Sequence, residues 1–361
     1  MTAERYTGEE LGSDTSFIRK IVYKKKERFS MAYPKPLSEK ALQRLYKESG
    51  LDTRAQGFLH DFFAACANLY GAIELRDAWD VYQQISEDKP KLRRKDLVAF
   101  SAITRREEQP YYVFETEEVY SEENHNELSR LIVSKDLLRG GYGKFIWLYK
   151  VMEQAVNYPP CVPIDFLSYA SPKPEKEETE LLHFLGRLKV TADVWKNRAG
   201  KEYPCEHKGK RLREFSFLNS DERFEVEYLQ KRPKQQAAFL ADCAGTEAEK
   251  IVRRLREEDN IGYFSPAESV QHVTEELSEV GVELTFQQAQ ELTRLMMEFH
   301  NHSRHWCICG WKPVELAQRY KLQGKPSISF GPGMQKAFAN GDMDREEMVR
   351  QLRAMGLTVE E

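Results

Sequence analysis

The sequence lacks the features of a secreted, membrane-spanning or strongly basic protein. No run approaches the ~18 consecutive apolar residues of a membrane span, and the first residues carry no basic segment followed by an apolar one. Only six cysteines are present, widely scattered, and the formal net charge is −4. We therefore expect a cytoplasmic protein with reduced thiols and no membrane partner, in which any nucleic-acid contact comes from a local basic patch.

The signatures of several enzyme classes are also missing. The sequence contains no Gly-x-x-x-x-Gly-Lys-Ser/Thr phosphate loop, no Gly-x-Ser-x-Gly elbow and no His-Glu-x-x-His metal motif. The glycine-rich stretch 140–144 follows a predicted helix, whereas a phosphate loop follows a strand. The sequence therefore predicts no catalytic residues and favours a non-enzymatic protein.

The composition is that of a folded chain with more than one part. Hydrophobic residues make up 41% of the 361 residues and charged residues 31%, which is typical of globular proteins. Proline- and glycine-containing breaks divide the chain into four predicted segments. They are a charged tail or arm over 1–36, a module over 37–121, a mixed helical and β-hairpin domain over 122–245, and a helical domain over 246–361. The expected fold class is α-dominated α+β.

The module over 37–121 has the order of elements found in a winged helix. Apolar residues at helical spacing predict helices over 58–70, 75–85 and 94–107, with a short extended piece near Ile73. The aromatic and β-branched stretch 111–120 predicts strands. In winged-helix proteins the third helix enters the major groove of DNA. This order predicts a winged-helix-like module.

Basic residues cluster around the predicted third helix. They are Lys89, Lys91, Arg93, Arg94 and Lys95 near its start, with Arg105 and Arg106 at its end. Such a cluster suits phosphate contacts, and a helix N-terminus also favours anions. The predicted wing, 115–118, is acidic and repels phosphate. The alternatives are therefore nucleic-acid binding through this helix, a protein-docking module, or a solvated basic face.

The remaining two thirds of the chain read mainly as helices. Helices are predicted over 128–138 and 145–156, and the alternation of Phe224, Val226 and Tyr228 predicts a β-hairpin around 219–222. Capping-box patterns starting at Thr246, Ser265 and Thr285 predict three helix starts. A last helix is predicted to end at Gly356.

A dense His/Cys/Trp segment supports two incompatible interpretations. One is a zinc site drawing on the following side chains: His300, His302, His305, Cys307, Cys309, Cys205 and His207. The one-residue spacings within this set are poor for chelation, and His300 and His302 point about 200° apart on a helix. The other interpretation is a structural corner in which Trp306 and Trp311 are buried anchors and Pro313 starts a new helix. The corner is the main prediction, with no bound cofactor, and zinc is the alternative.

Two short patches carry a resemblance. The segment from Asn301 to Leu316, with Arg304, Trp306 and Gly310, resembles an Asn-x-x-Arg-x-Trp…Gly-x-x-Pro-x-Glu-Leu segment of uncharacterised proteins from Gram-positive bacteria. The stretch 68–71 looks like an N-terminal part of the same group. Some members also carry the SEC-C zinc motif, which begins Cys-x-Cys-Gly, as 307–310 does, but the following 311–314 departs from it. The resemblance implies a bacterial protein and no particular activity.

From these observations we expect a regulatory or interaction protein whose partner is another protein or a nucleic acid. The alternative, from a different class, is a metal-dependent enzyme or zinc-stabilised module centred on 300–309.

Overall fold

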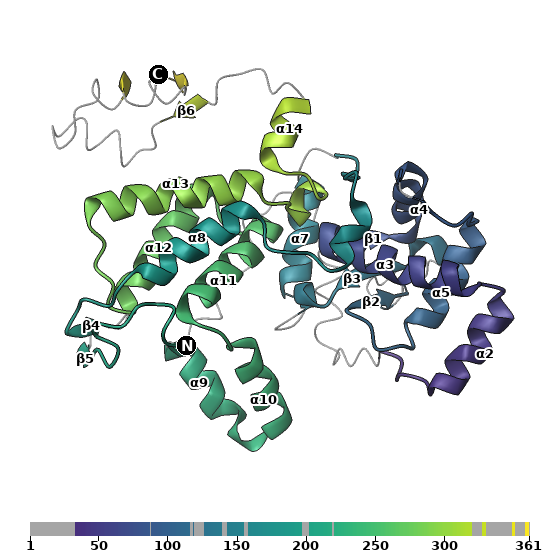
Figure 1. Cartoon of the computed structure of the whole chain (residues 1–361), viewed down its shortest axis with the longest axis horizontal. Coiled ribbons are helices and arrows are strands. Elements are labelled where there is room, and N and C mark those ends of the chain that lie inside the picture. The colour runs from purple at the N-terminus through teal and green to yellow at the C-terminus, as the bar shows by residue number, and fades with distance from the viewer. Residues whose placement is uncertain are drawn as a thin grey trace, which may run out of the picture. The chain divides into compact units, whose positions relative to one another are not determined.

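The computed structural model describes most of the chain from residue 33 onward. The described residues are 33–86, 88–115, 118, 126–138, 143–154, 158–196, 202–218, 220–319, 327–329, 349–350 and 358–360. The chain divides into two compact units, 1–313 and 314–361. Helices dominate and a small three-stranded sheet accompanies them (Figure 1), so the prediction of an α-dominated α+β fold is confirmed.

The first part of the larger unit contains the three predicted helices, a strand at Ile73 and a strand within the predicted stretch 111–120. Its elements are α2 (Glu39–Ser49), α3 (Thr53–Tyr70), β1 (Ala72–Glu74), α4 (Leu75–Gln84), α5 (Arg94–Thr104), β2 (Tyr111–Phe114) and β3 (Leu131–Ser134). Helix α3 begins where the Asp52 side chain accepts a hydrogen bond from the amide of Ala55, which satisfies one free N–H of the first turn. It ends at Gly71, whose positive φ of 68° few other residues adopt.

The three strands form an antiparallel sheet in the order β1–β3–β2. Ile132 at the centre of β3 pairs with Ile73 on one side and Val113 on the other, and is fully buried. The predicted helix over 128–138 is therefore wrong: a 3-10 turn, η2 (Glu127–Ser129), precedes β3, and a second, η3 (Asp136–Leu138), follows it. A short apolar run fits a central strand as well as a buried helix, and pairing with β1 and β2 decides between them.

The rest of the larger unit is helical. Its main elements are α7 (Gly143–Gln154), η4 (Phe166–Ala170), α8 (Lys176–Arg187), α11 (Glu247–Ile261), α12 (Pro266–Glu279), α13 (Phe286–His302) and η6 (Trp306–Ile308). The capping boxes at Thr246, Ser265 and Thr285 are all present, which confirms the three predicted helix starts. The predicted helix near 145–156 is confirmed as α7.

The β-hairpin lies earlier in the chain than predicted. The antiparallel pair is β4 (Val194–Lys196) with β5 (Glu202–Pro204), whereas 220–228 forms helix α9 (Ser220–Tyr228). The predicted hairpin around 219–222 is therefore wrong. The alternation of Phe224, Val226 and Tyr228 covers too few residues to specify a strand, and Phe224 is 68% exposed, so no buried sheet face selects it. After η5 (Leu229–Lys231), helix α10 (Pro233–Asp242) follows.

Three hydrophobic clusters hold the larger unit together. The first surrounds α3 with α4, α5 and the sheet, and is rich in phenylalanine. The second lies among α8, α11, α12 and α13. The third joins the strands to α7, to Ile261 at the end of α11, and to Trp306 and Cys307. The end of α13 packs in the second cluster and the segment that follows it packs in the third, so this segment lies at the boundary between the two clusters.

The smaller unit is described only in part. Helix α14 (Pro313–Arg319) begins at the proline that the sequence predicted as a helix start, and β6 (Ser327–Ser329) pairs in parallel with β7 (Thr358–Glu360). Most of the predicted final helix falls outside the described residues, as does the charged arm up to residue 32. The four-part domain division stays a prediction. Within the described part of the chain, no helix is long and apolar enough to cross a membrane.

Candidate functional site

The His/Cys/Trp segment forms a tight corner directly after α13. Helix α13 ends at His302, the chain turns through η6, and Cys309 and Gly310 take left-handed backbone angles, with φ of 54° and 77°. The predicted anchors Trp306 and Trp311 are 6% and 7% exposed. The prediction of a structural corner is confirmed in this respect.

Both tryptophans are tied to distant backbone. The indole Nε1 of Trp306 donates to the carbonyl oxygen of Asn68 at 2.8 Å, and that of Trp311 donates to the carbonyl of Pro159 at 2.8 Å. Gly71 lies so close to Trp306 that a Cβ there would be 2.6 Å from its ring. A buried indole N–H needs such a partner, so these bonds fix the corner against α3.

The two sequence patches that carry the resemblance therefore meet in space. Tyr169 connects them: Arg304 donates its Nε–H to the Tyr169 hydroxyl at 2.8 Å, and the Asn68 side chain donates to the Tyr169 carbonyl at 2.8 Å. Within its own patch, Arg304 Nη1 donates to the Gly310 carbonyl at 3.0 Å. Tyr70 donates from its hydroxyl to the carbonyl of Cys161 at 2.7 Å. This network gives Arg304, Trp306 and Gly310 of the segment a structural role in packing and hydrogen bonding.

A cluster of three ligand-type side chains lies beside the corner. Asp259 comes from the end of α11, His300 from the last turn of α13, and His305 from the link to η6. Their ligand atoms lie within 4.8 Å of one another, the one such group of three or more in the described ranges. His300 Nδ1 is 3.4 Å from Asp259 Oδ2, and the imidazole rings of His300 and His305 are perpendicular with centroids 4.7 Å apart.

The cluster is secluded from solvent. Asp259 is 4% exposed and His305 is 2% exposed. His305 Nε2 lies 2.9 Å from the carbonyl oxygen of His300, and because a carbonyl only accepts, Nε2 is the donor. Burial lowers the pKa of His305, although the nearby Asp259 carboxylate raises it. Backbone hydrogen bonds with His300 and Asp259 also raise this pKa.

The other predicted metal ligands are not among these three clustered side chains. His302 faces solvent near Glu298, as the helical angle from His300 requires. The Cys307 thiol donates to the backbone carbonyl of Asp259 at 3.8 Å. Burial raises the pKa of the Cys307 thiol to about 12 and that of Cys309 to about 11. Cys205 donates to the carbonyl of Val280.

His207 stacks on Phe215, with ring centroids 4.2 Å apart. Of the seven predicted ligands, the cluster brings together only His300 and His305. Sequence reasoning missed Asp259 because it lies in a charged run of α11 with no spacing signal to link it to either histidine.

The basic residues around α5 divide into two groups. Three of them have intramolecular roles. The Lys89 ammonium donates to the carbonyl oxygens of Tyr82, Gln83 and Ile85, which caps the end of α4. Arg93 pairs with Asp96 at 3.1 Å. Arg105 is buried and pairs with Glu115 and Glu118, at 2.6 Å each.

The second group faces solvent. Lys91, Arg94, Lys95 and Arg106 are exposed, and Arg94 lies over the Trp79 ring at 5.9 Å. On the face of α5 between them lie only small or aliphatic side chains: Val98, Ala99 and Ala102. Helix α5 thus has exposed cations at both ends and small, uncharged side chains at the centre of its exposed face.

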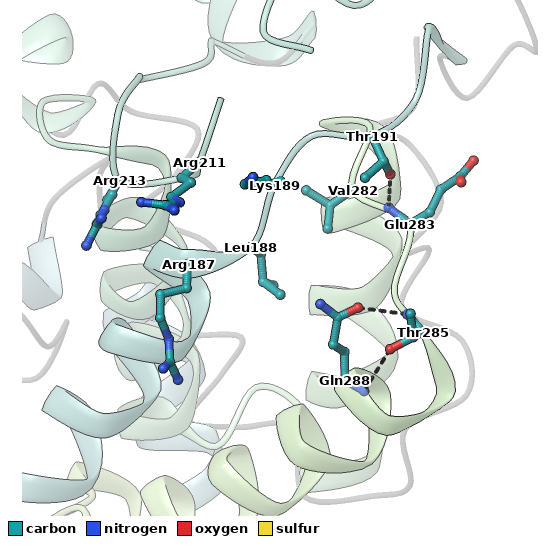
Figure 2. Close-up of a pocket in the computed structure, with 10 residues that line it drawn as sticks. All are labelled: Arg187, Leu188, Lys189, Thr191, Arg211, Arg213, Val282, Glu283, Thr285 and Gln288. Atoms are coloured by element: carbon teal, nitrogen blue, oxygen red, sulfur yellow. Dashed lines mark hydrogen bonds between the residues drawn. The ribbon is translucent and has the colours of Figure 1, made fainter. Parts of the chain in front are cut away.

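A separate open cleft of about 460 Å³ carries a second group of cations. Arg187, Lys189, Arg211 and Arg213 line one side, and Thr285 and Gln288 at the start of α13 line the other (Figure 2). Glu283 is the one carboxylate among the lining residues, and Figure 2 shows it directed outward. The lining contains no histidine or cysteine and no pair of carboxylates, so it offers no acid–base pair for catalysis.

Comparisons of the chain with protein families, with curated proteins and with solved structures found no match. The chemistry of the described residues therefore carries the functional argument alone.

Proposed function

We propose that residues 53–134 form a winged-helix module that binds duplex DNA through α5, and that the protein is a non-enzymatic regulator. The observation that carries the proposal is the order helix, strand, helix, helix, strand, strand over α3, β1, α4, α5, β2 and β3, with β3 between β1 and β2. Winged-helix modules share this order and place the third helix in the major groove.

The exposed face of α5 suits a groove. Val98, Ala99 and Ala102 leave room for base edges, while Arg94 and Lys95 at one end and Arg106 at the other can reach phosphates on either side. The partner that fits is a duplex, because a rigid helix with flanking cations matches two phosphate rows across a groove.

The acidic wing is no longer an obstacle. Glu115 accepts from Arg105 at 2.6 Å and from Arg130 at 2.8 Å, and Glu118 accepts from Arg105. Burial raises the pKa of Glu115, but hydrogen bonds and charges from Arg130 and Arg105 lower it on balance. Two of the wing carboxylates that the sequence suggested would repel phosphate, Glu115 and Glu118, are therefore paired with arginines.

The experiment is a titration of duplex DNA with the full chain over a series of salt concentrations. Binding should weaken steeply with salt, because each neutralised phosphate releases counterions. Replacing Lys91, Arg94 and Lys95 together with alanine should flatten the log–log slope by about two to three units and leave the fold intact. The matched control replaces Arg187, Arg211 and Arg213 of the cleft, which removes the same charge and should leave the slope unchanged.

Three outcomes would overturn the proposal. The first is no binding of duplex DNA at low salt. The second is loss of binding in the cleft variant with an unaltered α5 variant, which assigns the cations of the cleft instead. The third is an equal loss in both variants, which assigns binding to general charge attraction.

A further inference from the structure

Two buried polar atoms face each other without hydrogen-bond partners. They are Oδ2 of Asp259 and Nδ1 of His300, both shielded from solvent. An unsatisfied buried polar group costs about 1–3 kcal/mol, so native structures rarely leave two of them side by side. Their separation of 3.4 Å is long for a hydrogen bond.

That separation is the one a shared metal ion requires. Zinc binds histidine nitrogen and carboxylate oxygen at about 2.0–2.2 Å, and two such ligands at a tetrahedral angle lie about 3.3–3.6 Å apart. The third member, His305, also offers its ligand atom within 4.8 Å of the other two. Its hydrogen bond to the backbone of His300 holds the ring in place, as outer contacts do for metal-bound histidines.

We propose that Asp259, His300 and His305 form a three-ligand site for a first-row divalent metal ion such as Zn²⁺. This ligand set differs from the one that the sequence suggested, because Asp259 replaces the cysteines. Two imidazoles and one carboxylate are the donors of many zinc sites. The proposal does not rest on DNA binding by α5.

The position of the site favours a structural ion over a catalytic one. Asp259 and His305 are almost fully buried and Nδ1 of His300 is shielded from solvent, so a substrate cannot reach the three ligand atoms. Asp259 lies next to the end of α11, and Trp306 follows His305 directly. A bound ion therefore joins α11, α13 and the corner, and its binding free energy adds to the stability of the fold.

The test measures zinc content and thermal stability of the full chain purified without an affinity tag. The protein should hold about one zinc per chain, or take it up after chelator treatment, and its melting temperature should rise with free Zn²⁺. His300→Gln should abolish the zinc-dependent rise. His302→Gln, a matched change of an exposed histidine in the same turn, should leave it intact.

Cys307→Ser separates this ligand set from the thiolate set. Retention of zinc in Cys307→Ser supports the proposal, and its loss there while His300→Gln retains zinc overturns it. Substitution with Co²⁺ gives a second readout that does not depend on the folding of variants: the native protein should show no sulfur-to-metal charge-transfer band. A melting temperature that neither chelator nor Zn²⁺ changes, in a protein that takes up no zinc, also overturns the proposal.

Discussion

The corner around Trp306 and the exposed face of α5 contain the residue types that most often mark function, yet they use them in opposite ways. At the corner, the side chains of Trp306, Arg304 and Trp311 donate hydrogen bonds to backbone carbonyls within the molecule. On α5, Arg94 and Lys95 are exposed. The difference shows that burial, and not residue type, separates a side chain that holds the fold from one that can meet a partner.

The same contrast separates two neighbouring residues just after the end of α5. Arg105 and Arg106 are adjacent in sequence, but Arg105 is buried among carboxylates and Arg106 is exposed. Substituting a buried residue and an exposed residue of the same chemical type, and comparing the change in stability, tests this contrast directly.

The largest effect is expected for Trp306→Ala. Removing an aromatic side chain that is 6% exposed deletes its packing against the third cluster and its bond to Asn68, and should cost about 3–5 kcal/mol of unfolding free energy. The matched control is Phe224→Ala, because Phe224 is 68% exposed and its loss should change stability by less than about 0.5 kcal/mol. Denaturant unfolding measures both. A Trp306→Ala protein as stable as the parent would contradict the structural role of the corner.

An intermediate effect is expected for Arg105→Ala. The substitution removes the guanidinium that pairs with both Glu115 and Glu118. Because both carboxylates are about one-third exposed, the free energy of unfolding should fall by roughly 1–3 kcal/mol. Arg106→Ala should cost less than about 0.5 kcal/mol. Equal losses of unfolding free energy in the two variants would contradict the division of the basic cluster into internal and exposed residues.

The smallest effect concerns acid. Because the folded-state pKa of Glu115 lies below its ordinary value of 4.5, the unfolded state binds its proton more readily. Its contribution to stability is therefore full above about pH 4.5 and declines as pH falls through the folded pKa. In Glu115→Gln this part of the acid-induced loss should be absent, as seen in melting temperatures measured between neutral pH and about pH 3. An unchanged pH profile would show that the wing carboxylate is not held by its arginines.

Elements set by local interactions were the most predictable. Helix starts could be predicted at Thr246, Ser265 and Thr285 because each capping box forms between two residues three positions apart. No distant part of the chain is involved. Trp306 and Trp311 were predictable as buried anchors because large aromatic side chains between two helices have few alternatives to burial.

Elements that depend on distant partners could not be read in the same way. The stretch 131–134 was predicted as helix because its place between β1 and β2 is fixed by residues 17 to 61 positions away. Phe224 and Tyr228 were predicted as strand because their exposure on α9 leaves no trace in the local pattern. At the candidate metal site, His300 and His305 were predicted as ligands but Asp259 was not.

The sequence by itself determined the helical character of the chain, the helix starts in its last third, the corner at Trp306 and the absence of a long apolar helix among the described residues. Each follows from interactions between residues a few positions apart. Tertiary structure alone decided that Arg105 serves the wing, that Lys89 caps α4, and that Asp259 meets His300 and His305. Those roles depend on which segments pack together, and packing energy is shared over contacts that no short stretch of sequence contains.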